Sequence, residues 1–484
     1  MAGPPSAIRL LLLLVLLPAL VGCASYTDRV RDAQRSVLSG EHETAITVIN
    51  EELGVDDSRL QPDRLNGDRA LLLLERAALL QALGEYDQSS LDLIAAEDRL
   101  EWVDLSSGTA ESVLRFFYSD DVGTYRAPPH ERLLVHVLNM INFLALDRLE
   151  SARVEARRFD ILQGFFIDEE LRGVLPDLLG LGNYLAGAAF EASREYDEAA
   201  RYYTRAHLYG VWPEPGPDRL LDLLALTGYA GADLGDLQDR AAPIFEQARA
   251  HPRPDRHTYQ ARHQLGGDTL LVVQTGLIPY RQARRIPMTQ ALTYSSRSPY
   301  HALYLTPANH RQALHLYRRG IVTWVNMPEL TRRGLPSRRR VQFTAGQDGH
   351  SGAVISLSDQ AEAAWVLVAG TALAAAISRA VVRAVAGEAT RVVTSSAARS
   401  QGADRAVAGV LGWLLALAVE GTLAAADTPD TRGWTSLPAD IHLIRTRYTP
   451  GPMELSVTVG GAQDRQDVLI HSNRFQLFNF SRLR

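Results

Sequence analysis

The 484-residue sequence contains no lysine, so all 50 of its basic side chains are arginine. This absence excludes chemistry that needs a lysine amine, such as lysine-bearing phosphate loops, Schiff-base enzymes and serine–lysine hydrolases. Cysteine is nearly absent as well: Cys23 is the only one, so no disulfide can form within the chain. Stability therefore has to come from packing. A chain of this length with 46% apolar residues can bury the cores of about two to four domains.

The sequence also lacks the common catalytic motifs. It has no Gly-x-Ser-x-Gly turn, no His-Glu-x-x-His pair and no phosphate-binding loop. The histidines between His251 and His263, with Asp255, match no standard spacing of metal ligands, and this segment is predicted to be a loop. Two converging carboxylates of a glycosidase would leave no signature in a sequence, so that alternative stays open. We predict a non-enzymatic protein without a metal or cofactor.

The single cysteine ends a short apolar run. Residues 10–20 are too few to span a bilayer and instead have the pattern of a secretory signal. The stretch Leu20-Val21-Gly22-Cys23 resembles the bacterial lipobox, in which the thiol is acylated and the cysteine becomes the new N-terminus. Residues 1–22 would then be a signal peptide, and Ala24 favours the periplasmic face of the outer membrane. The alternative is an ordinary secretory signal with an incidental cysteine.

A helical pattern repeats through residues 23–250. The template Gly-x-Tyr-x-x-Ala-x-x-x-aromatic-x-x-Ala begins, with substitutions, at Gly40, Gly84, Asp147 and Arg194. Its first position suits the turn that ends a helix, and its aromatic and alanine positions share one face of the next helix. The pattern resembles the tetratricopeptide repeat at wider spacing and predicts a divergent α-solenoid of four or five helix pairs that binds protein partners. The predicted repeat-packing residues are Gly40, Gly84, Tyr86, Ala152, Tyr196, Ala199, Tyr203 and Ala206.

The pattern changes after this helical half, so the whole chain is predicted to be α followed by α+β. Two prolines close to His251 interrupt the helices, and residues 251–267 are predicted to be a linker. Residues 268–357 have the composition of a first β section. The predicted strands are Asp268–Thr275, His301–Leu305, Ile321–Val325 and Val341–Thr344.

Two apolar segments rich in alanine and glycine follow, within residues 358–427. Ala363–Ser378 and Ala406–Val419 carry no charge, and each is shorter than the ~20 residues of a membrane-spanning helix. We predict a helical hairpin buried against the β domain. A membrane-inserted hairpin is the alternative, and Gly370 and Ala374 have the small-x-x-x-small spacing that suits either arrangement.

Residues 428–484 are predicted to form a second β section. Ile441–Tyr448 is predicted to be a strand with Ile441 and Leu443 inward, Ile444 as a further inward candidate, and Arg445 and Arg447 outward. The turn at 449–452 would return the chain into Met453–Val459 as a hairpin. Two more strands are predicted at Gln466–Ile470 and Phe475–Phe480.

Positive charge is concentrated in the middle of a chain whose net charge is −6. Between Pro252 and Asp348 there are fifteen arginines and four acidic residues, an excess of +11. This region would bind an anionic ligand such as peptidoglycan, or it is simply a solvated basic face; no nucleic acid is predicted. The candidate anion-binding residues are Arg332, Arg333, Arg338, Arg339, Arg340 and Arg432.

Three stretches together resemble a family of Gram-negative outer-membrane lipoproteins. They are Val154-Glu155-Ala156-Arg157-Arg158, Thr275-Gly276-Leu277-Ile278-Pro279 and the motif Asp-x-Arg-x-Trp-x-x-Leu-Pro at residues 430–438. The resemblance implies a tetratricopeptide-like helical half, a β section with an alanine-rich insertion, and an association with envelope assembly, but no catalytic residues. Within the third motif we expect Trp434 and Leu437 to fill a core, and Asp430 and Arg432 to organise the turn before the strand.

These observations predict a lipid-anchored periplasmic scaffold that binds protein partners through its helical half. One alternative is a protein that binds peptidoglycan or assists envelope assembly through its basic β domain. Another is a helical hairpin that inserts into the membrane during secretion or remodelling.

Overall fold

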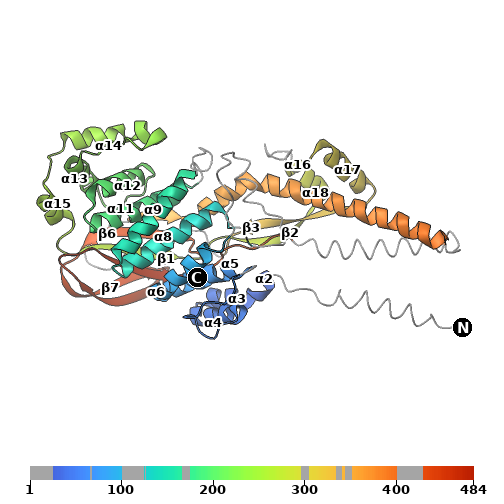
Figure 1. The fold of residues 1–484 in the computed structure, drawn as a ribbon, viewed down its shortest axis with the longest axis horizontal. Coiled ribbons are helices and arrows are strands. Elements are labelled where there is room, and N and C mark those ends of the chain that lie inside the picture. Colours follow the sequence, from blue (N-terminus) through green and yellow to red (C-terminus); the bar gives the residue numbers. More distant parts are fainter. Residues whose placement is uncertain are drawn as a thin grey trace. The chain divides into compact units, whose positions relative to one another are not determined.

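The computed structural model describes residues 26–65, 68–100, 125, 127–165, 175–295, 305–333, 341–343, 352–400 and 429–483. The chain divides into two compact units. The large unit comprises Asp32–Tyr280, Leu330–Val366 and Gly433–Arg484. The small unit comprises the remaining segments, of which 26–31, 281–295, 305–329, 367–400 and 429–432 are described. The order of elements confirms the predicted layout of a helical half followed by an α+β half (Figure 1).

Successive helices of the first half are neighbours in space. From α4 to α14, each long helix described contacts the next one along the chain, and α8 also contacts α11. The helices form five consecutive pairs, of which the first four are joined by short turns and the last by the ten residues 228–237. The pairs are α3 (Arg31–Ser39) with α4 (His42–Leu53), α5 (Arg69–Ala82) with α6 (Tyr86–Glu97), α8 (Pro129–Ala145) with α9 (Leu149–Phe165), α11 (Pro176–Ala192) with α12 (Tyr196–Leu208), and α13 (Asp218–Thr227) with α14 (Gln238–Ala250).

The four residues at which the sequence template begins all end a helix in the left-handed conformation. Gly40 and Gly84 have φ of 82° and 83°, and the non-glycine residues Asp147 and Arg194 have φ of 58° and 62°. In each case the turn residue and the residue after it donate backbone hydrogen bonds to carbonyls three and five residues back, which is the Schellman pattern. The same turn geometry therefore recurs at four places whose sequences differ.

Small side chains let the paired helices approach closely. Ala152, Ala199 and Ala206 are fully buried, as is Tyr203; Tyr196 is buried and Tyr86 is half-buried. A Cβ added at Gly187 would lie 2.4 Å from the ring of Tyr203. These contacts show that the alanine positions of the template and a glycine on the facing helix determine the distance between α11 and α12.

The second half of the large unit contains two sheets. The first has the order β5-β6-β1-β9, in which β1 (Asp268–Thr275) is antiparallel to β6 (Asp440–Arg447) and parallel to β9 (Gln476–Arg482). β5 (Ala353–Ser356) lies at its edge. The second sheet has the order β4-β7-β8, formed by β4 (Val341–Phe343), β7 (Gly451–Val459) and β8 (Ala462–Ile470).

A hydrophobic core joins the two sheets. It includes Leu271 and Val273 from β1, Ile444 from β6, and Leu455 and Val457 from β7. Helices α5 and α8 contact β9 of the first sheet, and α11 contacts β5. All eight residues of β1 are buried, which is typical of a strand covered on both faces and confirms the predicted strand.

The predicted hairpin between residues 441–448 and 453–459 is wrong. β6 is paired on both sides, by β1 and β5, so it has no free edge for β7. The hairpin is instead formed by β7 and β8, and it turns at Gly460 and Gly461, both of which have positive φ. β8 consequently begins at Ala462, before the predicted start at Gln466.

The predicted linker also differs from the structure. Within residues 251–267 the segment Arg256–His263 is a helix, α15, rather than a loop. The side chain of Asp255 caps it by accepting a hydrogen bond of 2.7 Å from the backbone N–H of Thr258. Tyr259 of this helix is fully buried, so the segment belongs to the packed core of the large unit.

The small unit contains elements that the sequence pattern did not reveal. β2 (Tyr280–Pro287) pairs with β3 (Trp324–Thr331), which begins three residues later than predicted. Two short helices, α16 (Met288–Ser295) and α17 (Pro307–Arg318), pack with residues 373–384 around one core. Of the predicted strand His301–Leu305, residues 301–304 lie outside the described residues.

The first alanine-rich segment forms part of one long helix, α18 (Leu357–Ser400). Ala374, Ala376 and Ile377 are buried in the core of the small unit. The second predicted arm, Ala406–Val419, lies outside the described residues, so the hairpin stays a prediction. In the described part of the chain, no helix is both long enough and apolar enough to cross a membrane.

Candidate functional site

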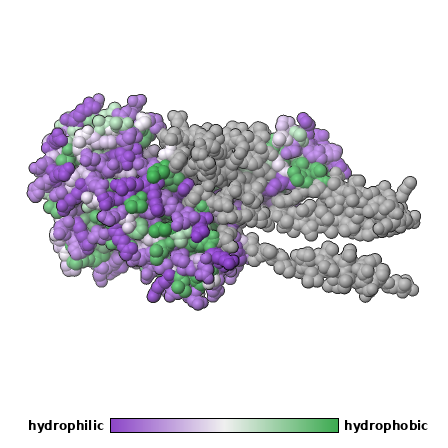
Figure 2. Space-filling view, viewed as in Figure 1, coloured by the Kyte–Doolittle hydropathy of each residue, from purple (hydrophilic) through white to green (hydrophobic). Residues whose placement is uncertain are grey.

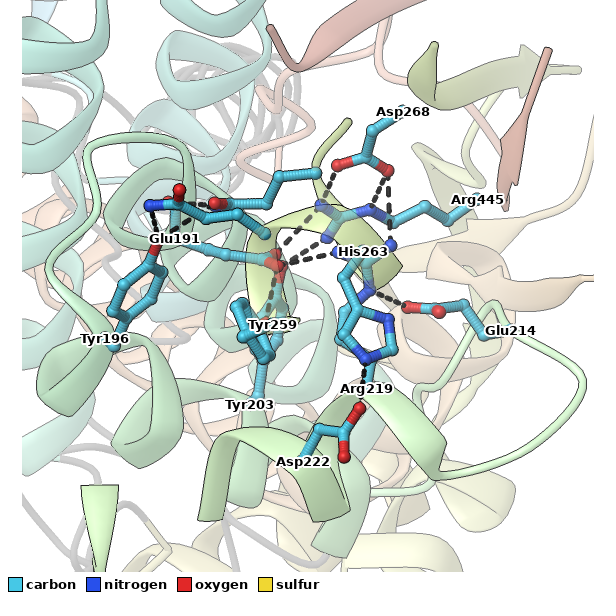
Figure 3. Close-up of polar contacts among 12 residues, drawn as sticks. Glu191, Tyr196, Tyr203, Glu214, Arg219, Asp222, Tyr259, His263, Asp268 and Arg445 are labelled. Carbon is cyan, nitrogen blue, oxygen red and sulfur yellow. Dashed lines mark hydrogen bonds and ion pairs between the residues drawn. The ribbon is translucent and has the colours of Figure 1, made fainter. Parts of the chain in front are cut away.

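Four charged side chains form a buried network inside the large unit, with Glu214 at its edge (Figure 3). The guanidinium of Arg445 lies 2.7 Å from Asp268 (Nη2 to Oδ2) and 2.9 Å from Glu191 (Nη2 to Oε2). The guanidinium of Arg219 contacts the same two carboxylates, at 2.7 Å to Glu191 and 3.2 Å to Asp268. None of the four side chains is more than 4% exposed. Two positive and two negative charges therefore balance one another out of contact with water.

Four different elements contribute these charges. Glu191 lies in the last turn of α11, and Arg219 in the first turn of α13. Asp268 is the first residue of β1, and Arg445 lies in β6, where it pairs with Leu270 of β1. The network consequently ties the last two helix pairs to the central strands of the sheet.

Tyrosine hydroxyls complete the hydrogen bonding of Glu191. Tyr203 donates to it at 2.7 Å and Tyr259 at 2.6 Å, while Glu214 accepts from Arg219 at 2.8 Å. Burial opposes ionisation of Glu191, but Arg219 and Arg445 outweigh it and lower the pKa of Glu191 to about 2. Burial raises the pKa of Tyr203 and of Tyr259 well above the usual range.

This network has the properties of a structural junction rather than a catalytic site. A general acid or base works best with a pKa near the working pH, and the pKa values of Glu191 and the tyrosines are shifted away from neutrality. Each carboxylate is already held by both guanidiniums. What the arrangement can do is fix the orientation of the helices on the sheet.

A second polar cluster surrounds Asp222 of α13. His251 and His263 contact its two oxygens at 2.8 and 2.7 Å, and Arg262 lies 3.1 Å away. Burial acts against ionisation, but hydrogen bonds from His263, His251 and Arg262 outweigh it and lower the pKa of Asp222. The two histidines at the ends of the predicted linker segment therefore meet at one carboxylate. His263 holds α15 against α13, and His251 holds the end of α14 there.

The tryptophan motif is held by two buried glutamates. Glu75 of α5 accepts hydrogen bonds of 2.7 Å from the backbone N–H groups of both Thr435 and Ser436. Glu131 of α8 accepts one of 3.1 Å from the backbone N–H of Trp434. Trp434 is 2% exposed and Leu437 fully buried, which confirms that both fill a core. Asp430 and Arg432 pair with each other, since two guanidinium nitrogens of Arg432 lie 2.9 and 2.8 Å from the Asp430 carboxylate. The turn before β6 lies at Thr435 and Ser436, so the predicted role of this pair in that turn stays a prediction.

One group of side chains has the composition of a metal site. Potential ligand atoms of Glu97, His136 and Glu155 all lie within 4.8 Å of one another. The two ring nitrogens of His136 face different carboxylates, at 2.7 Å for Glu155 and 3.4 Å for Glu97. A guanidinium nitrogen of Arg158 lies 3.3 Å from Glu155 and 3.4 Å from Glu97. These three residues are where the described chain could hold a metal ion, but Arg158 already supplies a cation to both carboxylates.

The described arginines among those predicted to bind anions make contacts within the chain. Arg332 makes ion pairs with Asp359 (2.7 Å) and Glu362, and Arg333 lies over the ring of Tyr280, 4.2 Å from its centroid. Arg432 is paired with Asp430. The remaining candidates, Arg338, Arg339 and Arg340, lie outside the described residues, as do the lipobox residues Leu20, Val21, Gly22 and Cys23.

The sequence prediction missed the central residue of the network. Arg445 is 3% exposed, although it was assigned to the outward face of its strand. Residues two apart in a strand share a face, so the buried Ile441 and Leu443 place Arg445 on the inner face as well. An arginine on a buried face requires a buried acidic partner, but the sequence does not indicate which acidic residue that is.

Comparisons with known proteins provide no template for this arrangement. No family model, curated protein or solved structure matches the chain. The function therefore has to be argued from the surfaces and contacts described above.

Proposed function

We propose that this protein is a non-enzymatic scaffold of the cell envelope that holds a protein partner on its helical half. Lipidation of Cys23 would anchor it to the periplasmic face of the outer membrane, in keeping with the resemblance to outer-membrane lipoproteins. The five helix pairs would form a divergent solenoid of tetratricopeptide type. The recurrence of the same helix-ending turn at Gly40, Gly84, Asp147 and Arg194 supports the proposal of a solenoid.

The observation that carries the proposal is an exposed stripe along α9. Val154 and Ile161 are 47% and 65% exposed, and the exposed Arg157 and Arg158 lie between them. The spacing i, i+3, i+4, i+7 places all four side chains on one face of the helix. The opposite face of α9, including Ala152, Ala156 and Phe159, is buried in the helical core.

This stripe suits a partner helix or strand that carries apolar and acidic side chains. Two exposed β-branched residues seven positions apart supply apolar anchors of the kind used in helix-in-groove recognition. Arg157 is 60% exposed and its only described carboxylate contact is at 3.9 Å from Glu195, so its guanidinium is available for an acidic group. The buried junction around Arg445 would keep the helices, and hence the stripe, in a fixed orientation.

Site-specific crosslinking in intact cells tests the partner. A photoreactive residue at position 161 should form a crosslinked species of discrete mass, and the same residue at Leu469, 54% exposed on β8, should not. Introducing Arg157→Glu beside the crosslinker should abolish the species, because the acidic partner would be repelled. Equal crosslinking at 161 and 469, or crosslinking that is indifferent to Arg157→Glu, would contradict a specific docking surface.

The anchor has a separate test. The intact mass of the mature protein should correspond to a chain that begins at an acylated Cys23, and Cys23→Ala should remove the lipid and release the protein from membranes washed at high salt. A mature chain that begins elsewhere would overturn the anchor without affecting the crosslinking result.

A further inference from the structure

The small unit is strongly basic. Its three segments, Met1–Arg31, Arg281–Glu329 and Leu367–Arg432, together contain sixteen arginines and seven acidic residues, and residues 281–329 alone contain seven arginines and one acidic residue, Glu329. The acidic residues that balance the whole chain thus lie almost entirely elsewhere. A concentrated charge of this sign attracts anionic surfaces over about a Debye length.

Helix α17 presents a basic face to solvent. Arg311, His315 and Arg318 are exposed and follow the spacing i, i+4, i+7, so they lie on one side of the helix. On the other side, Ala313 and Leu316 are fully buried in the core of the small unit. Within the described residues neither Arg311 nor Arg318 contacts a carboxylate, whereas most arginines of the large unit are paired.

The small unit also exposes aromatic and apolar side chains. Trp324 is 46% exposed, and the guanidinium of Arg285 lies over its ring, 5.8 Å from the centroid. Tyr294 of α16 is 48% exposed and Val382 of α18 is 63% exposed. Figure 2 shows hydrophilic and hydrophobic residues side by side over the visible face of α16 and α17. Tryptophan and tyrosine favour the boundary between lipid headgroups and acyl chains, where one edge of the ring is polar and the other apolar.

We propose that the small unit binds the surface of a bilayer that contains anionic phospholipid. Arg311 and Arg318 contact headgroup phosphates, and Trp324 and Tyr294 enter the interfacial layer. A headgroup layer offers many phosphates without a fixed stereochemistry, which matches arginines spread along a convex helix face rather than gathered in a pocket. This inference goes beyond the scaffold function and does not depend on the acyl chain at Cys23, because it concerns a separate surface of the polypeptide.

Vesicle binding by the mature chain carrying Cys23→Ala provides the test, since any membrane contact is then made without lipidation. The chain should sediment with vesicles containing phosphatidylglycerol at 50 mM salt and dissociate from them at 300 mM salt. It should not bind vesicles of pure phosphatidylcholine. Each arginine near an anionic surface is worth about fivefold in affinity, so Arg311→Gln with Arg318→Gln should weaken binding by roughly 30-fold.

A matched control separates this surface from charge in general. Arg249 and Arg256 are exposed in the large unit, and Arg249→Gln with Arg256→Gln removes the same charge and should leave vesicle binding within about twofold. Circular dichroism confirms that both double variants fold. Three results would overturn the proposal: no binding to anionic vesicles, equal binding to neutral ones, or equal loss in the two double variants. Binding to peptidoglycan in place of vesicles would likewise overturn it and assign the basic surface to a glycan.

Discussion

Arg445 and Asp268 form a bidentate ion pair between the two central strands of the first sheet, with Nη2–Oδ2 and Nε–Oδ1 distances of 2.7 and 3.0 Å. Both side chains are at most 1% exposed. The pair is part of a four-charge network, because the Arg445 guanidinium also contacts Glu191 and the Asp268 carboxylate also contacts Arg219. Removal of one member should therefore have a different consequence from removal of a balanced pair.

We predict that Arg445→Met alone lowers the free energy of unfolding by about 3–5 kcal/mol, because it leaves Glu191 and Asp268 to share one buried guanidinium. Asp268→Asn alone should lower the free energy of unfolding by a similar amount, because it removes a buried negative charge where Arg445→Met removes a positive one. The double variant retains the balanced Glu191–Arg219 pair, whose atoms lie 2.7 Å apart, and should lose clearly less than the sum of the single changes. Urea unfolding of the four proteins measures this, and strict additivity would show that the charges act independently.

The turn residues of the helix pairs provide a second prediction. Arg194 has φ of 62°, a conformation that costs a side chain about 1 kcal/mol and glycine almost nothing, and it is exposed. Arg194→Gly should therefore raise the free energy of unfolding by about 1 kcal/mol. Gly84→Ala, at the equivalent turn with φ of 83° and no atom within 4 Å of an added Cβ, should lower it by a similar amount. Changes of equal sign at the two positions would contradict their equivalence.

Stability should fall as the solution becomes mildly acidic. Burial lowers the pKa of His207, His263 and His442. Below about pH 6.5 the unfolded chain binds protons at these positions while the folded chain does not, so protonation favours unfolding until the folded histidines also titrate. Their contribution is fully present above pH 6.5 and is lost as the pH falls towards the lowered pKa values.

His442→Gln should make the decline between pH 7 and pH 5 less steep. His442 is 4% exposed, and its removal eliminates one of the three groups whose protonation favours the unfolded chain. Chemical denaturation at several pH values measures the slope, with His257→Gln at an exposed position as the control. An unchanged slope in His442→Gln would show that this histidine does not contribute to it.

The sequence patterns predicted those elements whose burial is reflected in a local run or period of apolar residues. β1 contains a continuous apolar run over residues 270–273 and was predicted with both ends correct, because a strand buried on both faces favours such a run. α15 was missed since only Tyr259 of its eight residues is buried, so the helix has no apolar period and depends on its cap and on tertiary contacts. The pairing partners of β6 and β7 could not be predicted from local patterns either. Which strands pair depends on which sheet edges the rest of the fold leaves free.

The charged network shows the same limit for the candidate site. Its members come from positions 191, 219, 268 and 445, and nothing near any one of them in the sequence indicates the other three. Only the face assignment of Arg445 was accessible, from the period of two in its strand. By contrast, the burial of Trp434 and Leu437 was predictable, because large apolar side chains next to a buried strand usually pack into the adjoining core.

We predict that Glu75 holds the backbone of the tryptophan motif in its position. It accepts both backbone N–H groups of Thr435 and Ser436 and the hydroxyl of Thr435, at 2.7 to 2.8 Å. Burial raises the pKa of Glu75, and these hydrogen bonds offset part of the rise. Glu75→Ala leaves two buried N–H groups unpaired, and each unpaired group costs about 1–3 kcal/mol.

The predicted result is a local loss of protection around residues 433–438. Hydrogen exchange of a peptide covering them should accelerate strongly in Glu75→Ala and much less in Glu75→Gln, whose amide oxygen still accepts one of these bonds. A peptide from β7, which belongs to the other sheet, serves as the internal control. If exchange accelerates equally in both peptides, Glu75 stabilises the whole unit and does not specifically hold the motif.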